Sequence, residues 1–155
     1  MAAMRLLTVG KPRNVHIGAL AHEYYQRLGR GFNLTWDAVS EEPLSKGNGQ
    51  HVIEKEGQRL LARIGRDEWV VLLDVEGELV SSSVLAQHVE RWRQRGTPLV
   101  IIIGGPLGVD SRVRERADWR WSLSPLTFPH EVVPLLVLEQ LYRAWSILEH
   151  HPYHK

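Results

Sequence analysis

Two short runs of almost continuous apolar residues, 69–75 and 98–103, most constrain how this chain can fold. Each has the length of a β-strand, and segments with the helical spacing of apolar residues separate them. A strand that is apolar on both faces must be covered on both sides, as in parallel sheets. The pattern therefore predicts an α/β fold in which helices flank a parallel sheet.

The remaining segments extend the same alternation. Residues 4–10, 32–39 and 119–124 are further strand candidates. Apolar spacing and capping residues predict helices from Asn14 to the glycines at 29–31, over 53–64, from the serines at 81–83 past Trp92, over 110–117 and over 130–149. We expect an exposed loop over 40–50 and a turn at Gly77. A chain of 155 residues without an internal repeat suits a single domain spanning 1–155.

Composition excludes several classes of protein. The chain has no cysteine, which rules out disulfides, thiolate nucleophiles and cysteine-bound metals and fits a cytoplasmic protein. Residues 1–7 are too short an apolar stretch for a signal peptide, and no apolar run is long enough to cross a membrane. The net charge of +1 gives only a weak electrostatic indication of nucleic-acid binding.

The helix expected over 130–149 is apolar on nearly every side. Such a helix has to be buried all round, and one surface of a small sheet does not suffice for that. We therefore expect a homodimer in which a second subunit covers the rest of the helix. Pro134 fits because it falls in the first helical turn.

Two bends in the final third are candidate ligand-binding segments. Residues 104–108 (GGPLG) directly follow a strand end, where glycines allow a ligand to approach the backbone. A tight strand-to-helix turn explains them equally well, and their spacing matches neither phosphate-binding glycine pattern. Residues 123–130 contain two prolines, and a rigid connector is the simpler interpretation of this stiff loop.

Several polar residues are weaker candidates. Glu139 and Arg143 lie one helical turn apart, which favours an ion pair over an RNA contact. Asp74 either contacts a ligand or caps a turn. The tail 150–155 has three histidines but no carboxylate at a useful spacing, so we expect no metal; its His and Tyr side chains suit stacking on a base or hydrogen bonds to RNA.

Beyond these features, the sequence closely resembles the RlmH family of ribosomal RNA methyltransferases. The resemblance rests on ordered motifs that span nearly the full length: residues 8–11, 54–57, 72–74, 103–108, 121–130, 141–147 and 151–154. It implies a SPOUT fold, a parallel sheet with a C-terminal trefoil knot, that binds S-adenosyl-L-methionine (SAM) and works as a homodimer. Knots are otherwise rare in protein topology.

The resemblance also implies an activity and a set of site residues. The family methylates N3 of a pseudouridine in 23S ribosomal RNA within the assembled ribosome. The implied cofactor-binding residues in this chain are Leu73, Gly104, Gly105, Leu123, Ser124, Pro125, Leu126, Thr127 and Phe128. As catalytic residues we expect Arg143, His154 and Tyr153, with His130 and Glu139 as weaker candidates, because the N3 proton must leave and the ring oxygens then need stabilisation.

Two alternatives remain. One is a non-catalytic RNA-binding protein of the same fold. The other is an unrelated small nucleotide-binding protein, which the missing phosphate-loop patterns disfavour.

Overall fold

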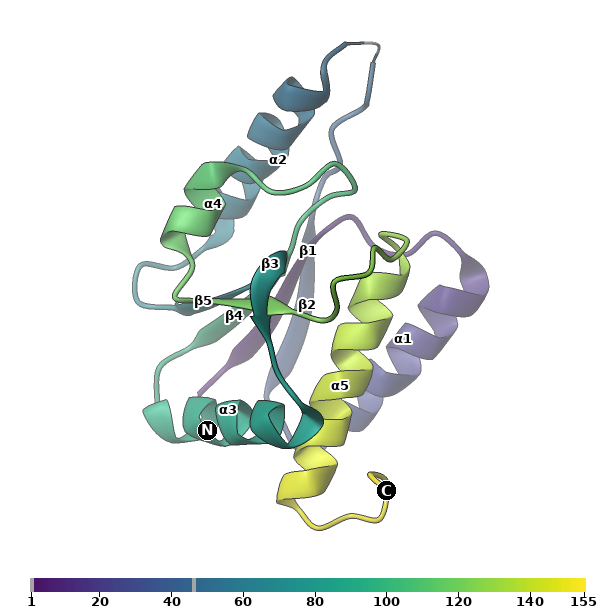
Figure 1. Cartoon of the computed structure of the whole chain (residues 1–155), viewed down its shortest axis with the longest axis vertical. Coiled ribbons are helices and arrows are strands. Elements are labelled where there is room, and N and C mark those ends of the chain that lie inside the picture. Colours follow the sequence, from purple (N-terminus) through teal and green to yellow (C-terminus); the bar gives the residue numbers. More distant parts are fainter. Residues whose placement is uncertain (1, 46) are drawn as a thin grey trace.

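The structure, a computed structural model, describes residues 2–45 and 47–155 (Figure 1). Strands and helices alternate as the sequence predicts. In chain order the elements are β1 (Met4–Val9), α1 (Val15–Leu28), β2 (Leu34–Val39), α2 (Gly49–Arg63), β3 (Trp69–Leu79), α3 (Ser82–Arg95), β4 (Leu99–Ile103), α4 (Ser111–Arg116), β5 (Trp119–Ser122) and α5 (Val132–Leu148). The α/β class is thereby confirmed.

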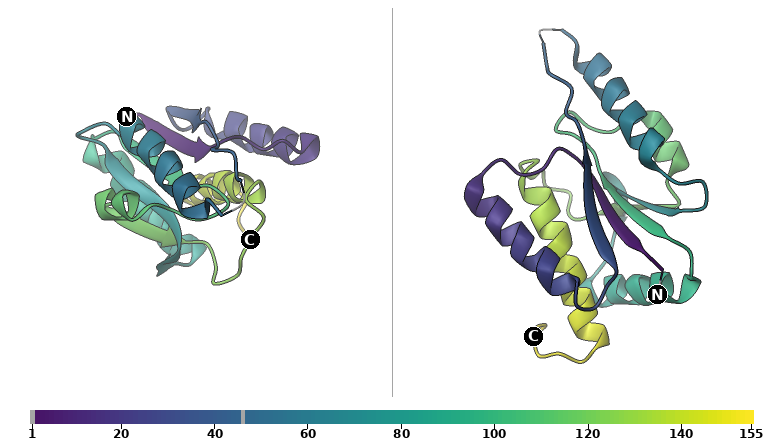
Figure 2. Two further views of the ribbon diagram at one scale, coloured as in Figure 1. Left: turned by 90° about the horizontal axis from the view of Figure 1, so that it is seen from above. Right: turned by 180° about the vertical axis from the view of Figure 1, so that it is seen from behind.

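The strands form one sheet in the order β2-β1-β4-β3-β5, and every recorded strand pair is parallel. Helices α1, α3 and α5 pack together on one face, whereas α2 and α4 lie on the other, as the views of Figure 2 show. Since the paired strands run the same way, their carboxyl ends lie toward one edge of the sheet. That edge is where open α/β sheets bind ligands.

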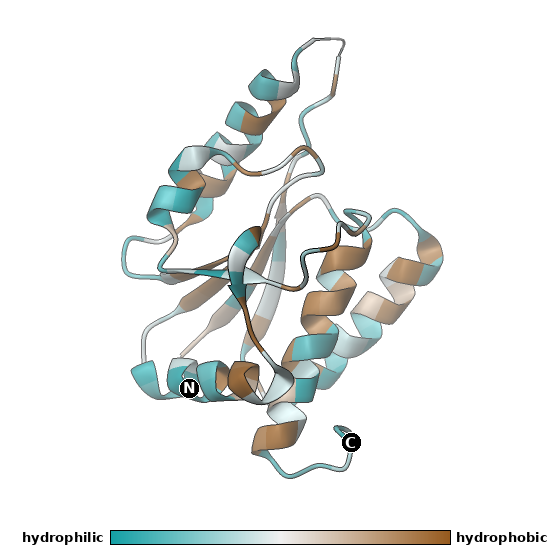
Figure 3. Cartoon of the chain, viewed as in Figure 1, coloured by the Kyte–Doolittle hydropathy of each residue, from teal (hydrophilic) through white to brown (hydrophobic). Residues whose placement is uncertain are grey.

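Strand β4 shows why both faces had to be covered. Leu99, Ile101 and Ile103 pack into the core beneath α1, α3 and α5. Val100 and Ile102, which point the opposite way, pack into the smaller core beneath α2 and α4. Each such side chain contributes roughly 1.5–3 kcal/mol when fully buried. In Figure 3 the apolar colouring accordingly follows the strands and α5, while outer helical surfaces are polar.

Helix α5 is covered more completely within one chain than the sequence argument assumed. It packs against both α1 and α3 as well as against the sheet. Each of its residues is buried or half-buried. One surface of the sheet indeed does not cover this helix alone, but α1 and α3 of the same chain cover much of the remainder that was assigned to a second subunit. The homodimer stays a prediction that needs other support.

Strand β3 continues two residues beyond the turn predicted at Gly77 and ends at Leu79. Gly77 lies inside the strand, and the pairing with β5 shifts register between Leu73 and Glu78. A β-carbon at Gly77 would lie 2.7 Å from the backbone of Arg120 on β5. The glycine thus allows a close approach of two strands, which the sequence pattern did not distinguish from a turn. The predicted loop over 40–50 is also shorter, since α2 begins at Gly49.

The helix starts follow the predicted caps. The Asn14 side chain accepts hydrogen bonds from the backbone of His16 and Ile17, and Ser81 accepts one from Val84. These acceptors satisfy amide groups that have no partner within the helix. Among the described residues, no helix combines the length and apolar character that crossing a membrane requires.

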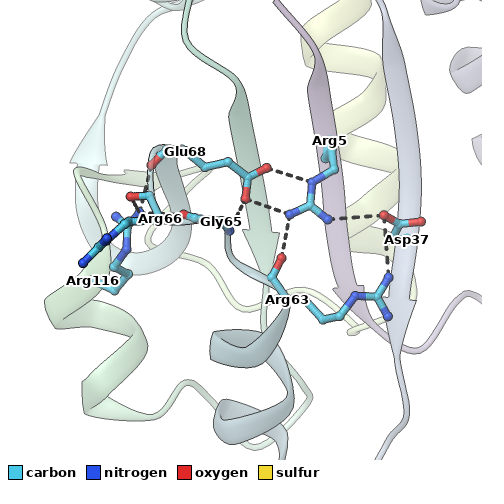
Figure 4. A network of polar contacts seen from close by, with 7 residues as sticks. All are labelled: Arg5, Asp37, Arg63, Gly65, Arg66, Glu68 and Arg116. Atoms are coloured by element: carbon cyan, nitrogen blue, oxygen red, sulfur yellow. Dashed lines mark hydrogen bonds and ion pairs between the residues drawn. The ribbon is translucent and has the colours of Figure 1, made fainter.

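A polar network joins the amino ends of the strands on the side of α2 and α4 (Figure 4). The Arg5 guanidinium donates to both carboxylate oxygens of Glu68 at 2.8 Å, to Asp37 and to the Arg63 carbonyl. Burial alone would raise the pKa of Glu68, but hydrogen bonds from Arg5 and from the Gly65 amide outweigh burial and lower that pKa. The network therefore links β1, β2 and the α2–β3 connection.

Replacing Glu68 with Gln is expected to lower the free energy of unfolding by about 1–3 kcal/mol at pH 7, because the half-buried guanidinium of Arg5 loses the nearer of its two carboxylate partners. The lowered pKa means that Glu68 contributes stability above its ordinary pKa of 4.5 and loses it as pH falls through the folded-state value. The difference between variant and parent should therefore shrink in acid. Urea unfolding at pH 7 and pH 3.5 measures both effects.

The matched control is Glu115→Gln, which removes a carboxylate from the exposed surface of α4. It should change stability by less than about 0.5 kcal/mol. Equal losses in the two variants would contradict the assigned role of Glu68.

Candidate functional site

A cavity of about 300 Å³ opens at the carboxyl ends of β3 and β4. Its wall is completed by the loop that follows β5 and by the start of α5. The volume lies at the lower end of the range for small-molecule sites. Its lining residues are Leu73, Asp74, Val75, Ile103, Gly104, Gly105, Pro106, Gly108, Val109, Arg114, Trp121, Leu123, Ser124, Leu126, Thr127, Phe128, His130 and Val133.

The structure brings nearly all the predicted cofactor-binding residues to this one cavity. Leu73, both glycines and five of the six residues over 123–128 line it; Pro125 does not. Two segments that lie apart in sequence, 104–108 and 123–128, thus form opposite parts of one wall. If 104–108 were only a turn and 123–128 only a connector, nothing would require the two segments to line the same cavity.

The glycines at 104 and 105 are required by close packing behind the bend. A β-carbon on Gly104 would lie 2.6 Å from Val109 Cγ2, and one on Gly105 would lie 2.2 Å from Glu56 Oε1. Only hydrogen atoms fit in these positions. Packing behind the bend therefore requires both glycines, whose backbone also lines the cavity.

Hydroxyl groups stiffen the second segment. The Ser124 hydroxyl accepts a hydrogen bond from the Leu126 amide at 3.0 Å, and the Ser122 hydroxyl donates to the Ser124 carbonyl at 3.2 Å. These local bonds hold the loop in one conformation. Leu126 and Val75, both at the cavity, are 70% and 60% exposed, so its mouth presents apolar side chains to the outside.

Asp74 is buried at the cavity, where its side chain caps a turn and also pairs with two arginines. Its Oδ1 atom accepts the Glu76 amide at 3.0 Å. Its Oδ2 atom accepts from Arg114 on α4 and from Arg120 on β5, each at 3.3 Å. The turn-capping role considered for Asp74 is therefore present, and two cations are held in addition.

His130 is a histidine that lines the cavity, and its protonation can be assigned from its partner. Its Nε2 atom lies 3.0 Å from the Val9 carbonyl oxygen, which can only accept. Nε2 must therefore carry the proton, and in the neutral ring Nδ1 is left as an acceptor. Among the described residues, no hydrogen bond to Nδ1 of His130 is recorded.

Glu56 lies behind the glycine bend and has no counterpart among the predicted site residues. It is 3% exposed on α2, and its Oε2 atom accepts the Glu42 amide at 3.1 Å. Within the described part of the chain, Oε1 has no hydrogen-bond partner. Burial raises the pKa of this carboxyl; the hydrogen bond from the Glu42 amide and the charge of Arg59 oppose the rise, and the charge of Glu41 adds to it.

A sequence signal for Glu56 was present. Val52, Glu56 and Leu60 are spaced by four residues, so they share one face of α2, and all three are buried. A lone carboxylate on an otherwise apolar helical face indicates a specific packing role.

The predicted catalytic residues gather elsewhere, around the C-terminal part of α5. The Arg143 guanidinium donates twice to Glu139 Oε1, and the Tyr153 hydroxyl donates to the same oxygen at 3.0 Å. Tyr24 from α1 lies 2.9 Å from the Tyr153 hydroxyl. His154 Nδ1 lies 3.2 Å from Arg143. We call these five residues the tail cluster.

The contacts of the tail cluster determine which atoms of Tyr153 and His154 carry a proton. Burial raises the pKa of Tyr153, and hydrogen bonds with Tyr24 and Glu139 raise it further, so its hydroxyl stays a donor. Because a guanidinium can only donate, His154 Nδ1 must accept, and the proton of the neutral ring lies on Nε2. The ion pair expected between Glu139 and Arg143 is present.

One chain does not place the tail cluster at the cavity. Val133 lines the cavity, and Arg143 lies about ten residues further along α5, which is about 15 Å along a helix. Of the predicted catalytic group, only the weaker candidate His130 reaches the cavity. Arg114 also lines it, and its position on a separate helix gave no local signal in the sequence.

The described residues contain no group of three or more histidines and carboxylates placed to hold a metal ion. Of the tail histidines, His151 packs edge-on against Trp145 at 4.8 Å between ring centres, and His154 lies against Arg143.

The fold and cavity define a class of protein with known members. Residues 2–154 match the family described as "Predicted SPOUT methyltransferase". Named relatives narrow the class: the chain is 43% identical to "Ribosomal RNA large subunit methyltransferase H" of Alkalilimnicola ehrlichii, covering 98% of each chain. It is 42% identical to the protein of that name in Pseudomonas fluorescens, covering 98% of this chain and 99% of the relative. The chain therefore belongs to the SPOUT methyltransferases, within the family of these large-subunit methyltransferases H.

Because the pKa of Glu56 is raised, its contribution to stability is present in acid and is lost as pH rises from 4.5 through the folded-state pKa. Glu56→Gln keeps the shape but cannot ionise. We expect the melting temperature of the parent, relative to this variant, to fall between pH 4 and pH 7. Thermal unfolding followed by circular dichroism measures this difference.

Glu54→Gln, on the exposed side of the same helix, is the control and should show no such trend. A difference between parent and Glu56→Gln that does not vary with pH would contradict the buried ionisable role.

Proposed function

We propose that this protein is a SAM-dependent methyltransferase that modifies N3 of a pseudouridine in 23S ribosomal RNA of the assembled ribosome. The observation that carries the proposal is the meeting of the glycine bend and the 123–128 loop at one cavity. Family membership supports methyl transfer to large-subunit ribosomal RNA. We further propose that residues 1–155 act as one cytoplasmic domain without a metal, and that the final third forms a trefoil knot.

The cavity residues fit SAM. The backbone at Gly104 and Gly105 lines the cavity and would lie beside the cofactor, while Leu73, Leu123 and Phe128 would supply apolar contacts. The stiff 123–128 loop lowers the entropic cost of holding a ligand. SAM supplies an electrophilic methyl group on its sulfonium.

The residues of this chain would then have to accept the N3 proton of pseudouridine and stabilise the negative charge that develops on its ring oxygens. The N3–H of pseudouridine is a weak imide acid, and its nitrogen becomes nucleophilic once the proton leaves. His130 lines the cavity, and its Nδ1 acceptor suits that proton. Arg143, with a donor Tyr153, suits the negative charge that the ring oxygens acquire.

We propose that a second copy of the chain brings the tail cluster to the cavity. Within one chain the two lie about 15 Å apart along α5. Exposed Val75 and Leu126 at the cavity mouth provide an apolar surface for that partner. A homodimer would thus complete each site with residues from both subunits.

The surface beside the tail cluster suits RNA. The Arg27 guanidinium lies over the rings of Tyr24 and Tyr142, at 5.1 and 5.6 Å from their centres. Flat cations and aromatic rings are the groups on which unpaired bases stack. With a net charge of only +1, recognition would depend on such local contacts and on ribosome shape.

Purified protein with SAM should add one methyl group to a pseudouridine in ribosomes from a strain that lacks the modification. Mass spectrometry of nucleosides identifies the product and its N3 position. Assembled ribosomes should react much faster than naked 23S RNA, because a weakly charged protein gains little from backbone electrostatics alone. If SAM and ribosomes both bind but no methyl is transferred, the non-catalytic RNA-binding alternative is correct.

Mixing two inactive variants tests the shared site. Gly105→Ala should abolish SAM binding in calorimetry, whereas Arg143→Ala should bind SAM normally and lose turnover. A mixture exchanged into heterodimers should regain about a quarter of the parent activity, since half the dimers carry one intact site. Gly18→Ala on α1, where a β-carbon meets nothing closer than 3.7 Å, is the packing control. A mixture with no activity, despite proven heterodimers, would place each site within one chain.

A further inference from the structure

Arg114 and Arg120 are brought together by one buried oxygen atom. Arg114 comes from α4 and Arg120 from β5, and each donates to Oδ2 of Asp74 at 3.3 Å. The Asp74 side chain is 2% exposed, while the arginine side chains are 41% and 46% exposed. A fixed carboxylate thus holds two guanidinium groups side by side, with their outer parts open to solvent.

The pair carries more positive charge than burial of Asp74 requires. One guanidinium neutralises one carboxylate, so the trio has a net charge of +1. A guanidinium has five N–H donors, and each of these two uses one in a recorded bond. For the described residues, no other hydrogen-bond acceptor is recorded for either side chain. Most of their donors therefore remain available to a ligand.

Neighbouring acids are already occupied or exposed. Glu78 accepts the indole N–H of Trp119 at 2.8 Å, and Asp118 accepts the Val70 amide and pairs with Arg116. Glu115 is exposed on α4, without a recorded ion pair to either arginine. Among the described residues, Asp74 is thus the one acidic side chain recorded in an ion pair with Arg114 or Arg120.

The pair also lies at the right place. Asp74 and Arg114 line the cavity proposed to hold SAM. Arg114 lines in addition a second, polar cavity of about 660 Å³ between α2 and α4, next to Gly108 and Val109. A strand that delivers a nucleotide to the first cavity would pass a guanidinium at its rim.

We propose that Arg114 and Arg120, held by Asp74, form a phosphate-binding site for the RNA strand whose nucleotide enters the cavity. This inference rests on the proposed function. Guanidinium groups match phosphate oxygens with two parallel hydrogen bonds, and a fixed pair loses little entropy on binding. Phosphate contacts set the position of a strand, which a protein of low net charge must achieve with few residues.

The test compares Arg114→Gln, Arg120→Gln and the double variant in methylation of ribosomes. Each single variant leaves Asp74 with one guanidinium, so folding should persist, and thermal unfolding checks it. Each should raise KM for ribosomes about tenfold at low salt, the size of one charge-assisted contact. Arg120→Gln, which changes no residue lining the cavity, should leave KM for SAM unchanged. The slope of log KM against log salt should fall by about one per lost contact.

Arg91→Gln is the matched control, because it removes one positive charge from the exposed surface of α3. It should leave both KM values unchanged. Arg114→Lys keeps the positive charge but loses the paired donors of the guanidinium. Its affinity for ribosomes should therefore lie between those of Arg114→Gln and the parent.

Equilibrium binding to ribosomes, which needs no turnover, separates this inference from the proposed function. Weaker ribosome binding by the variants supports the phosphate site even if no methyl group is transferred. Unchanged ribosome binding and KM would overturn it. A rise in KM for SAM alone would also overturn it, since the pair would then hold the carboxylate of the cofactor. A parent protein that neither binds nor methylates ribosomes would overturn both.

Discussion

Burial of the sheet on both faces is the constraint from which the rest of this structure follows. Because β4 sends Ile101 into one core and Ile102 into the other, neither face can hold a ligand. The carboxyl edge is then where backbone groups of several strands become accessible together. The glycine bend and the 123–128 loop both lie there, although residues 109–122 separate them in sequence. Packing of both faces thus leaves the carboxyl edge of the sheet as the place where a ligand can bind.

Helix α5 connects the two functional regions of the molecule. Its start contributes Val133 to the cavity, and its later turns carry Glu139 and Arg143 in the tail cluster. A stiff helix fixes the separation between these regions, so no small movement of one chain can bring them together. The proposed partner subunit follows from that rigid separation, together with the exposed apolar side chains at the cavity mouth.

The sequence predicted the fold class and most element positions because these depend on local patterns. Asn14 and Ser81 cap helices as their types suggest, and the apolar runs are buried strands. Gly77 was misjudged because a glycine that admits a neighbouring strand has the same local pattern as one that turns the chain. Cover for α5 from α1 and α3 depends on tertiary packing, which periodicity does not describe. Glu56 and Arg114 join the cavity region through contacts between distant elements, so only the structure could relate them to it.

The contact between Gly105 and Glu56 joins the sizes of two residues from different parts of the chain. Any side chain at position 105 would occupy the space of the Glu56 carboxyl, so the first position can enlarge only if the second becomes shorter. A single change at either position would be penalised while a paired change need not be. During divergence of such enzymes, these two positions should consequently evolve together, so that a change in the bend is accompanied by a change on α2.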